Sequence, residues 1–436
     1  MTVCQAGSHP RRRFGGIVAS MAVAESPPLR SAKSGERSGI GVLVAAILAM
    51  GLTGPGQTIG VSVFIDDLVD GLGISRTQVS NAYLVGTLSA SLLLPVVGRQ
   101  IDRFGVKRSQ VVIGLIFGLA LLNMSLVTGL ITLTIGFFGI RLMGQGSLSL
   151  VALLSVSLRF DKSRGTALGV YTMAAAGLLA LVPIGLSFVI SEVGWRSAWR
   201  VAAVVVAVVA PALALAALRK MPKGAVADAR YRSDGDLDEQ TGVDRNTALG
   251  TRGFWIVASV SGSTAMLITG LTFHQIDLLG DVGLSEEAAA AMFLPQVLGS
   301  SIVGLLVGAS ADRIGVRYLP ALGGILLTAA LLLGSVAAPG ALVFVYAVTV
   351  GAAGGAVNTM GSTVLPLWFG TKHLGSIKGT MQLINAGASA LGPASLALLE
   401  ARFGSYPPAI LVLASLAVAA TLFAFTQPAH IRVGHT

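Results

Sequence analysis

The stretch that decides the fold occurs twice in the chain, as Gly98-Arg-Gln-Ile-Asp-Arg-Phe-Gly-Val-Lys-Arg108 and as Gly308-Ala-Ser-Ala-Asp-Arg-Ile-Gly-Val-Arg-Tyr318. The two copies share the pattern Gly-x-x-x-Asp-Arg-x-Gly-x-basic. Each copy follows one long apolar run and precedes another. A short charged loop between two membrane-length segments, present once in each half of the chain, indicates a membrane protein built by duplication.

The composition of the whole chain agrees with a membrane protein. Of its 436 residues 53% are hydrophobic and 11% are charged, and the mean hydropathy is +0.79. A soluble protein carries about 25% charged residues. The net charge of +10 comes from basic residues in short loops between apolar runs, so no nucleic-acid partner is expected. Cys4 is the single cysteine, which excludes a disulfide framework or a thiolate metal site.

Runs of about 20 apolar residues predict twelve membrane spans. They cover residues 39–64, 78–98, 108–128, 131–156, 165–190, 198–218, 253–276, 287–309, 317–337, 341–367, 375–400 and 407–427. The prediction is an all-α membrane protein with two pseudo-symmetric halves of six helices each. Its parts are a disordered cytoplasmic arm (1–38), an N-terminal half (39–218), a solvated cytoplasmic linker (219–252), a C-terminal half (253–427) and a cytoplasmic tail (428–436).

The distribution of charge predicts the orientation. With the N-terminus inside, the 30 Lys and Arg residues lie on the cytoplasmic side except for Arg141 within a span and four outer residues, Arg76, Arg196, Arg200 and Arg402. Many acids lie outside, among them Asp66, Asp67, Asp70, Asp277, Glu286 and Glu287. The positive-inside rule therefore places both termini in the cytoplasm of a multi-pass inner (plasma) membrane protein.

The first residues allow two interpretations. Arg11-Arg12-Arg13-Phe14, followed by small and apolar residues as far as Ala24, resembles a twin-arginine export signal. The alternative is a basic arm, or a chain that truly starts at Met21. We expect the second interpretation, because removal of a signal would invert the charge pattern.

The sequences of the two halves align at an offset of 210 residues. Pairs that match include Gly73 with Gly283, Ser75 with Ser285, Asp67 with Asp277, Gly144 with Gly354 and Pro183 with Pro393. The chain resembles a transporter of the major facilitator superfamily over nearly its whole length. The resemblance implies alternating access, with the site between the two halves.

The resemblance also implies that the repeated loops belong to the cytoplasmic gate. The residues concerned are Gly98, Asp102, Arg103, Gly105, Lys107, Arg108, Gly308, Asp312, Arg313 and Gly315. Asp102 is expected to face the start of span eleven near Gly375, where the positive end of the helix dipole stabilises a carboxylate. Asp312 is expected to meet the start of span five in the same way. Arg103, Lys107 and Arg108 can pair with Asp102 or with lipid headgroups.

Arg141 is the one charge deep within a predicted span, near the bilayer midplane. A buried arginine there faces a cavity or a partner, and Gln145 shares its helix face. Three roles remain open: a counter-charge for an anionic substrate, a part of a proton-coupling device, or a structural arginine bonded to backbone carbonyls. The superfamily pattern at this place is Arg-x-x-Gln-Gly-x-Gly, whereas this chain has Arg141-Leu-Met-Gly144-Gln145-Gly146.

Further candidates for substrate contact are polar residues at cavity depth: Gln57, Tyr171, Asn358 and Asn385. Gln57 follows Gly54-Pro55-Gly56, which is expected to break span one and free backbone carbonyls. His274, Asp277 and Asp67 lie at the outer ends of spans and are candidates for proton coupling or for an outer gate.

Short motifs select a branch of the superfamily. Arg164-Gly-Thr-Ala-Leu-Gly169, Gly194-Trp-Arg196, Lys378-Gly379, Leu391-Gly-Pro393 and Gly404-Ser-Tyr406 resemble bacterial monocarboxylate and oxalate–formate carriers. The signature of drug/proton antiporters is absent from span five. We therefore expect a monomeric, non-enzymatic carrier of a small organic anion, coupled to protons or to a counter-anion, without cofactor or metal. Drug or metabolite efflux and a non-transporting membrane sensor are the alternatives.

Overall fold

The computed structural model describes residues 30–160, 164–219, 242–370 and 373–427. The predicted all-α fold of twelve spans is confirmed: helices dominate and the described residues contain no β-strand. The first half consists of α1 (Arg30–Leu52), η1 (Gly54–Gly56), α2 (Thr58–Val61), η2 (Ser62–Phe64), α3 (Ile65–Leu72), α4 (Arg76–Phe104), α5 (Val106–Ser125), α6 (Leu130–Ile140), η3 (Arg141–Leu148), α7 (Ser149–Arg159), α8 (Arg164–Val193) and α9 (Trp195–Ala217).

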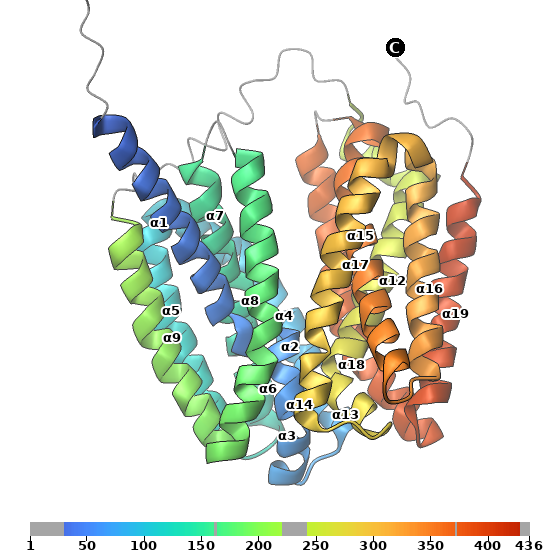
Figure 1. The fold of residues 1–436 in the computed structure, drawn as a ribbon, viewed down its shortest axis with the longest axis horizontal. Coiled ribbons are helices and arrows are strands. Elements are labelled where there is room, and N and C mark those ends of the chain that lie inside the picture. Colours follow the sequence, from blue (N-terminus) through green and yellow to red (C-terminus); the bar gives the residue numbers. More distant parts are fainter. Residues whose placement is uncertain (1–29, 161–163, 220–241, 371–372, 428–436) are drawn as a thin grey trace, which may run out of the picture.

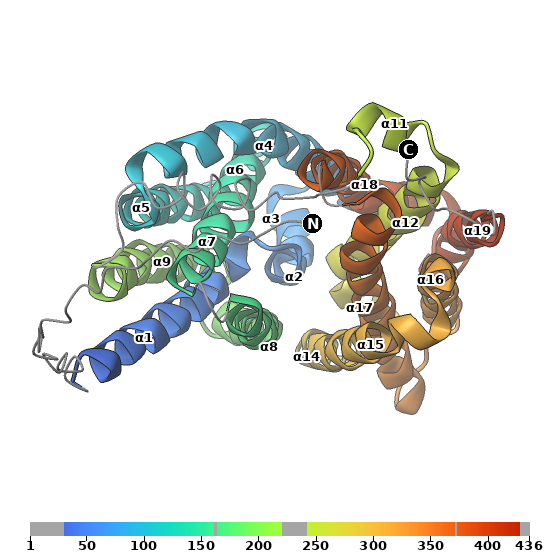
Figure 2. The same ribbon diagram turned by 90° about the horizontal axis from the view of Figure 1, so that it is seen from above.

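The second half repeats this arrangement (Figures 1 and 2). Its elements are α11 (Arg245–Leu249), α12 (Arg252–Phe273), α13 (Gln275–Gly280), α14 (Glu286–Ala291), α15 (Phe293–Ile314), η4 (Val316–Tyr318), α16 (Leu319–Ser335), α17 (Ala341–Phe369), α18 (Leu374–Phe403) and α19 (Tyr406–Phe425). Ten of the described helical stretches are long and apolar enough to cross a membrane. The first span is shorter because it is broken, and α18 is more polar, for reasons that the site explains below.

The duplication is visible in the backbone. Gly105 and Gly315 end the second span of each half with similar positive φ angles of +79° and +83°, a conformation that glycine adopts at no steric cost. At the opposite end, Ser75 and Ser285 are N-caps whose hydroxyls accept from Gln78 N at 3.2 Å and from Ala288 N at 3.3 Å. Local sequence rules thus place the same turns at both ends of both halves.

Small residues hold the helices together within each half. Gly351 and Gly355 of α17 pack directly on the backbone of α15, where an added Cβ would overlap the carbonyl oxygens of Gln296 and Ser300. In a bilayer such close backbone contact replaces the hydrophobic effect as the source of helix association. Exposed Leu, Val and Ile side chains cover the outer surface of both halves, as expected for helices that face lipid.

Two boundaries differ from the sequence prediction. Helix α1 begins at Arg30, so the last residues of the predicted disordered arm are helical; Ala, Lys, Glu and Arg in this stretch favour helix. The end of the predicted linker also folds: Asp244 caps α11, and Val243 N donates to Phe369 O at 3.1 Å. The tail 428–436 lies outside the described residues.

The two halves join at one end of the bundle. Figure 1 shows them meeting around α3, α13 and α14 and diverging toward the end that carries the repeated loops. Both hydrogen bonds that connect described residues of the two halves lie at the joined end, Arg76 to Asp277 and Thr77 to Ala397. We call it the closed end, and the opposite one the loop end.

Candidate functional site

A cavity of about 410 Å³ lies at the flank of the first half and a second, of about 360 Å³, lies between the halves. The second is the candidate site, because polar side chains from both halves line it. Its lining comes from α4, η3, α12, α17 and α18 and consists of Thr87, Ala90, Ser91, Leu94, Arg141, Gln145, Gly146, Ala265, Asn358, Gln382, Asn385, Ala386 and Ser389. Arg141 is the one charged side chain of this lining.

Arg141 is held by the broken first span. Its Nη1 atom donates to the carbonyl oxygen of Gly56 at 3.4 Å and to Oγ1 of Thr58 at 3.3 Å. Its guanidinium also lies 4.8 Å from the centre of the Tyr83 ring, within the range of a cation–π contact. The Gly-Pro-Gly break that the sequence predicts is therefore present, and one of the freed carbonyls binds the arginine. The guanidinium has a structural role along one edge.

The arginine begins a π-helical segment, η3, that also carries Gln145 and Gly146. Two serines complete the wider turns: Ser147 Oγ donates to Leu142 O at 2.6 Å and Ser149 Oγ to Gly144 O at 3.4 Å. Segments of π-helix are rare and are frequent at functional sites. Gly144 and Gly146 have no room for a Cβ because Phe117 and Leu94 press against them. Packing from both neighbours thus fixes the position of the arginine.

Several buried polar atoms around the cavity have no hydrogen-bond partner. They are Thr87 Oγ1, Arg141 Nε, Gln145 Oε1 and Asn385 Oδ1. A buried polar atom without a partner costs roughly 1–3 kcal/mol, and natural structures retain few of them. Four such atoms on the lining of one cavity are available to hydrogen-bond water or a polar ligand.

At the closed end a cluster of charged and aromatic side chains bridges the halves. Nη2 of Arg76, the first residue of α4, lies 2.7 Å from Asp66 Oδ1 and 2.8 Å from Asp277 Oδ1. The hydroxyl of Tyr406 donates to the other oxygen of Asp277. His274 is fully buried, and its Nε2 donates to Pro393 O at 3.0 Å. Burial raises the pKa of Asp277, while the hydrogen bond from Tyr406 and the charge of Arg76 oppose the rise.

Comparison with known proteins decides the family. The model of the Major Facilitator Superfamily matches residues 40–280, more than half of the chain. The chain belongs to this superfamily. It is a membrane transporter, not an enzyme. No curated protein sequence matches the chain.

Solved transporters share the fold of this superfamily member. A nucleoside transporter, NupG, superposes with a TM-score of 0.73 at 13% identity, covering 89% of this chain and 99% of its own. A bacterial homologue of the human lysosomal transporter Spinster, in its inward-facing and occupied conformation, superposes with a TM-score of 0.68 at 17% identity, covering 92% and 97%. Its inward-facing and unoccupied conformation gives 0.66 at 17% identity, covering 89% and 96%. Identities this low show the shared fold alone.

The superfamily fold brings four of the predicted substrate residues together: Arg141, Gln145, Asn358 and Asn385 line the cavity. The other two lie elsewhere. Gln57 donates to Thr53 Oγ1 at 3.0 Å and to Ser149 Oγ at 3.4 Å, so it connects the broken first span to α7. Tyr171 is buried in an apolar cluster with residues of α1 and α7. Sequence reasoning missed Thr87, Ser91 and Ser389, although their spacing places them on the polar faces of α4 and α18.

The predicted outer-gate residues all lie at the closed end. Arg76 also joins the halves there. The sequence showed Arg76 only as one of four basic residues on the outer side and did not predict this contact. Asp67 directly follows Asp66 of this cluster, on α3. Burial, together with the nearby charges of Glu286, Asp66 and Asp70, raises the pKa of Asp67 to about 6.

The predicted gate residues lie at the loop end, where α4 turns into α5 and α15 into η4. The guanidinium of Arg103 lies 5.4 Å from the ring of Phe104, Asp102 is partly buried, and Gly98 has open space around it. The side chains of Asp312 and Arg313 lie outside the described residues. The contacts of Asp102 with span eleven and of Asp312 with span five stay predictions.

Proposed function

We propose that this protein is a secondary active transporter of a small organic anion, of the monocarboxylate type. One observation carries the proposal: the cavity between the halves has a single charged side chain, a cation, and no acid among its lining residues. An arginine in the membrane interior is costly unless it pairs. A carboxylate ligand of the cavity would supply that pair.

In this proposal, different nitrogen atoms of the guanidinium hold Arg141 in place and bind the substrate. Nη1 is engaged with Gly56 and Thr58, whereas Nε is buried and has no partner. Arginine binds a carboxylate best through two parallel N–H groups. The proposal therefore gives Arg141 two roles, one that fixes its position and one that leaves a donor edge for the substrate. Gln145 and Asn385, each with a buried unpartnered oxygen, are the proposed partners of donor groups on the substrate.

The proposed cycle is a rocker-switch exchange between two states. With both termini cytoplasmic, as the charge distribution predicts, the closed end faces outward and the structure is an inward-open arrangement. Arg76 and Asp277 then form the outer gate with His274, and the repeated loops form the inner gate in the opposite state. Protons or a counter-anion supply the driving force, and Asp67 is the proposed proton acceptor, because a carboxyl of pKa about 6 titrates near neutrality. A monomer in the inner membrane suffices for this cycle.

Binding and flux test this function. Purified wild-type protein is screened by thermal shift against small carboxylates and against the uncharged amide of each acid. Stabilisation by a carboxylate and not by its amide is the expected result. Proteoliposomes loaded with the same carboxylate should then show flux that depends on a pH gradient or on a counter-anion.

Variants of the cavity separate binding from structure. Arg141→Lys keeps a charge but loses the donor edge, so carboxylate affinity should fall by about tenfold or more. Thr58→Val is the matched control. It removes one structural partner of Arg141 but leaves the charge and the residues that line the cavity in place, so carboxylate affinity should fall less than in Arg141→Lys. Equal stabilisation by the acid and its amide, or uptake unchanged in Arg141→Ala, would refute an anion site. Binding without flux under any gradient would favour a sensor, and selective binding of cationic drugs would favour efflux.

A further inference from the structure

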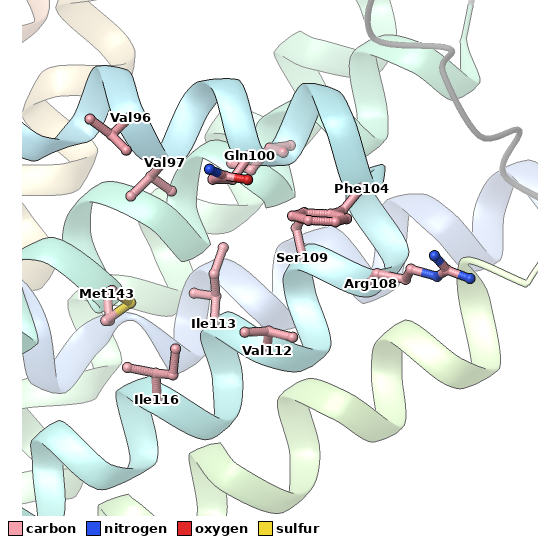
Figure 3. A pocket seen from close by; sticks show the side chains of 11 residues that line it. Val96, Val97, Gln100, Phe104, Arg108, Ser109, Val112, Ile113, Ile116 and Met143 are labelled. Carbon is pink, nitrogen blue, oxygen red and sulfur yellow. The ribbon is translucent and has the colours of Figure 1, made fainter.

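The larger of the two cavities lies on the flank of the first half, away from the substrate cavity. It is a cleft of about 410 Å³ between the C-terminal third of α4 and the first part of α5, and Met143 of η3 also lines it. Figure 3 shows Val96, Gln100 and Phe104 on the α4 side and Val112, Ile113 and Ile116 on the α5 side. A volume of this size suits a small organic ligand, and almost every group of the lining is apolar.

The sequence explains why these two helices leave a cleft. Pro95 lies inside α4, immediately before the first lining residues Val96 and Val97. Proline removes one helical hydrogen bond and tends to kink the helix. The turn at Gly105 nevertheless holds the ends of α4 and α5 together. The cleft lies between these two helices, which are joined at one end, and Ile101 and Ile113 are its buried lining residues.

The cleft opens toward the bilayer. Val96, Phe104, Val112 and Ile116 line it and yet are each more than 40% exposed. They lie on helices that are apolar and long enough to span the membrane. In the membrane such a surface contacts acyl chains, so an acyl chain is the ligand that is available at high concentration beside the cleft.

The mouth of the cleft at the loop end is basic. The stem of Arg108 lines the cleft, and its guanidinium points away from the apolar interior (Figure 3). The same loop and helix end carry three more basic residues, Arg99, Arg103 and Lys107. Asp102 is the one acidic residue of this stretch. Helix α5 also begins here without a side-chain cap, so its first N–H groups add positive potential.

We propose that this cleft binds one anionic glycerophospholipid, with an acyl chain between α4 and α5 and its phosphate on Arg108. The observations that carry the proposal are an apolar cleft open to lipid and a cation placed at its headgroup end. Basic pockets between helices at the cytoplasmic face attract anionic headgroups in this way. The bound lipid would contact Gln100 and Phe104 of the repeated loop, and so would hold the ends of α4 and α5 in one arrangement. The proposal does not depend on the identity of the transported substrate.

Native mass spectrometry of the full chain tests this site. The protein is exchanged into micelles with phosphatidylglycerol or with phosphatidylcholine, and bound lipid is counted for each variant. Val112→Trp fills the cleft and should abolish the bound phosphatidylglycerol. The matched control is Val204→Trp, on the lipid-facing surface of α9, which should retain the lipid.

The headgroup contact has its own pair of variants. Arg108→Ala should weaken binding of phosphatidylglycerol by about fivefold, the factor expected for one basic residue near an anionic surface. Arg317→Ala changes a basic residue at the loop end of the other half and should leave binding unchanged. Phosphatidylcholine bound as tightly as phosphatidylglycerol would overturn the headgroup assignment. Equal lipid binding by the two tryptophan variants, or a dimer that disappears only in Val112→Trp, would overturn the lipid site itself.

Discussion

Replacing Asp277 by Asn should open the closed end. Asp277 belongs to the C-terminal half and lies 2.8 Å from Arg76 of the N-terminal half. This is the only ion pair that joins described residues of the two halves. Asparagine keeps the shape and an acceptor oxygen for Tyr406 but removes the charge. The bond from Arg76 to Asp66, at 2.7 Å, lies within the first half and survives in either state. Of the two bonds of Arg76, only the one to Asp277 therefore favours the closed state over an open one.

The size of the effect follows from the burial of the pair. A hydrogen bond to a charged group contributes about 1.5–3 kcal/mol when buried, and a fully exposed ion pair contributes about 0–1 kcal/mol. The side chains of Arg76 and Asp277 are 19% and 24% exposed, which places their bond between these limits. Loss of about 1–2 kcal/mol shifts the ratio of closed to open molecules by about 5–30-fold.

Distances between spin labels measure the shift. Leu126 and Val336 occupy matching positions in the two halves at the closed end and are more than half exposed. Labels there, in a Cys4→Ser background, should move apart in Asp277→Asn. Labels at Phe104 and Tyr318 at the loop end should approach each other. Asp66→Asn is the control, because it removes the pair within one half; equal shifts in the two variants, or none in Asp277→Asn, would show that the bridge does not hold the halves together.

Three further outcomes follow from the same contacts. Asp67 binds a proton more tightly in the closed state, so closure should weaken as the pH rises from the ordinary aspartate pKa of about 4 to about 6; label distances in Asp67→Asn should lose that dependence. Tyr406→Phe removes a hydrogen bond that lowers the pKa of Asp277, so this pKa should rise further and closure should weaken more than in wild type as the pH is raised; the same label distances measure the change. Gly56→Ala brings a Cβ within 2.6 Å of Ile140 O and should destabilise the protein by about 1–3 kcal/mol in thermal unfolding, whereas Gly177→Ala, with open space, should not.

The sequence predicted those parts of the structure that depend on local rules. The turns at Gly105 and Gly315 follow from glycine at positive φ, and the breaks between helices follow from polar residues between apolar runs. The break at Gly54-Pro55-Gly56 was predictable because proline cannot donate and glycine packs closely. Its contact with Arg141 could be anticipated as one of three roles, since a buried arginine must bond to something nearby.

The remaining features depend on which helix faces meet, and the sequence leaves that open. Helices that are apolar on all sides show no periodicity that distinguishes lipid from protein. The polar faces of α4 and α18 were an exception, with Gln382, Asn385 and Ser389 at spacings of three and four residues. The bridge between Arg76 and Asp277 joins residues 201 positions apart. Only the assembled bundle shows this pairing, as it shows the π-helical turns of η3, which no local pattern predicts.

Two charged residues of this transporter stand at positions where the sequences of its two halves differ. At the offset that aligns the repeated loops, Arg76 corresponds to Glu286, each the residue that follows an N-cap serine. Two arginines or two glutamates would repel at the closed end, whereas the present pair lets one arginine reach acids of both halves. Arg141 corresponds to Gly351, which packs against the backbone of α15. A symmetric pair of arginines would leave no room for that packing, and the cavity therefore has its cation on one wall and neutral amides on the other. The repeated frame supplies two similar halves, and the unmatched residues supply the ion pair that joins them and the single charged side chain of the cavity lining.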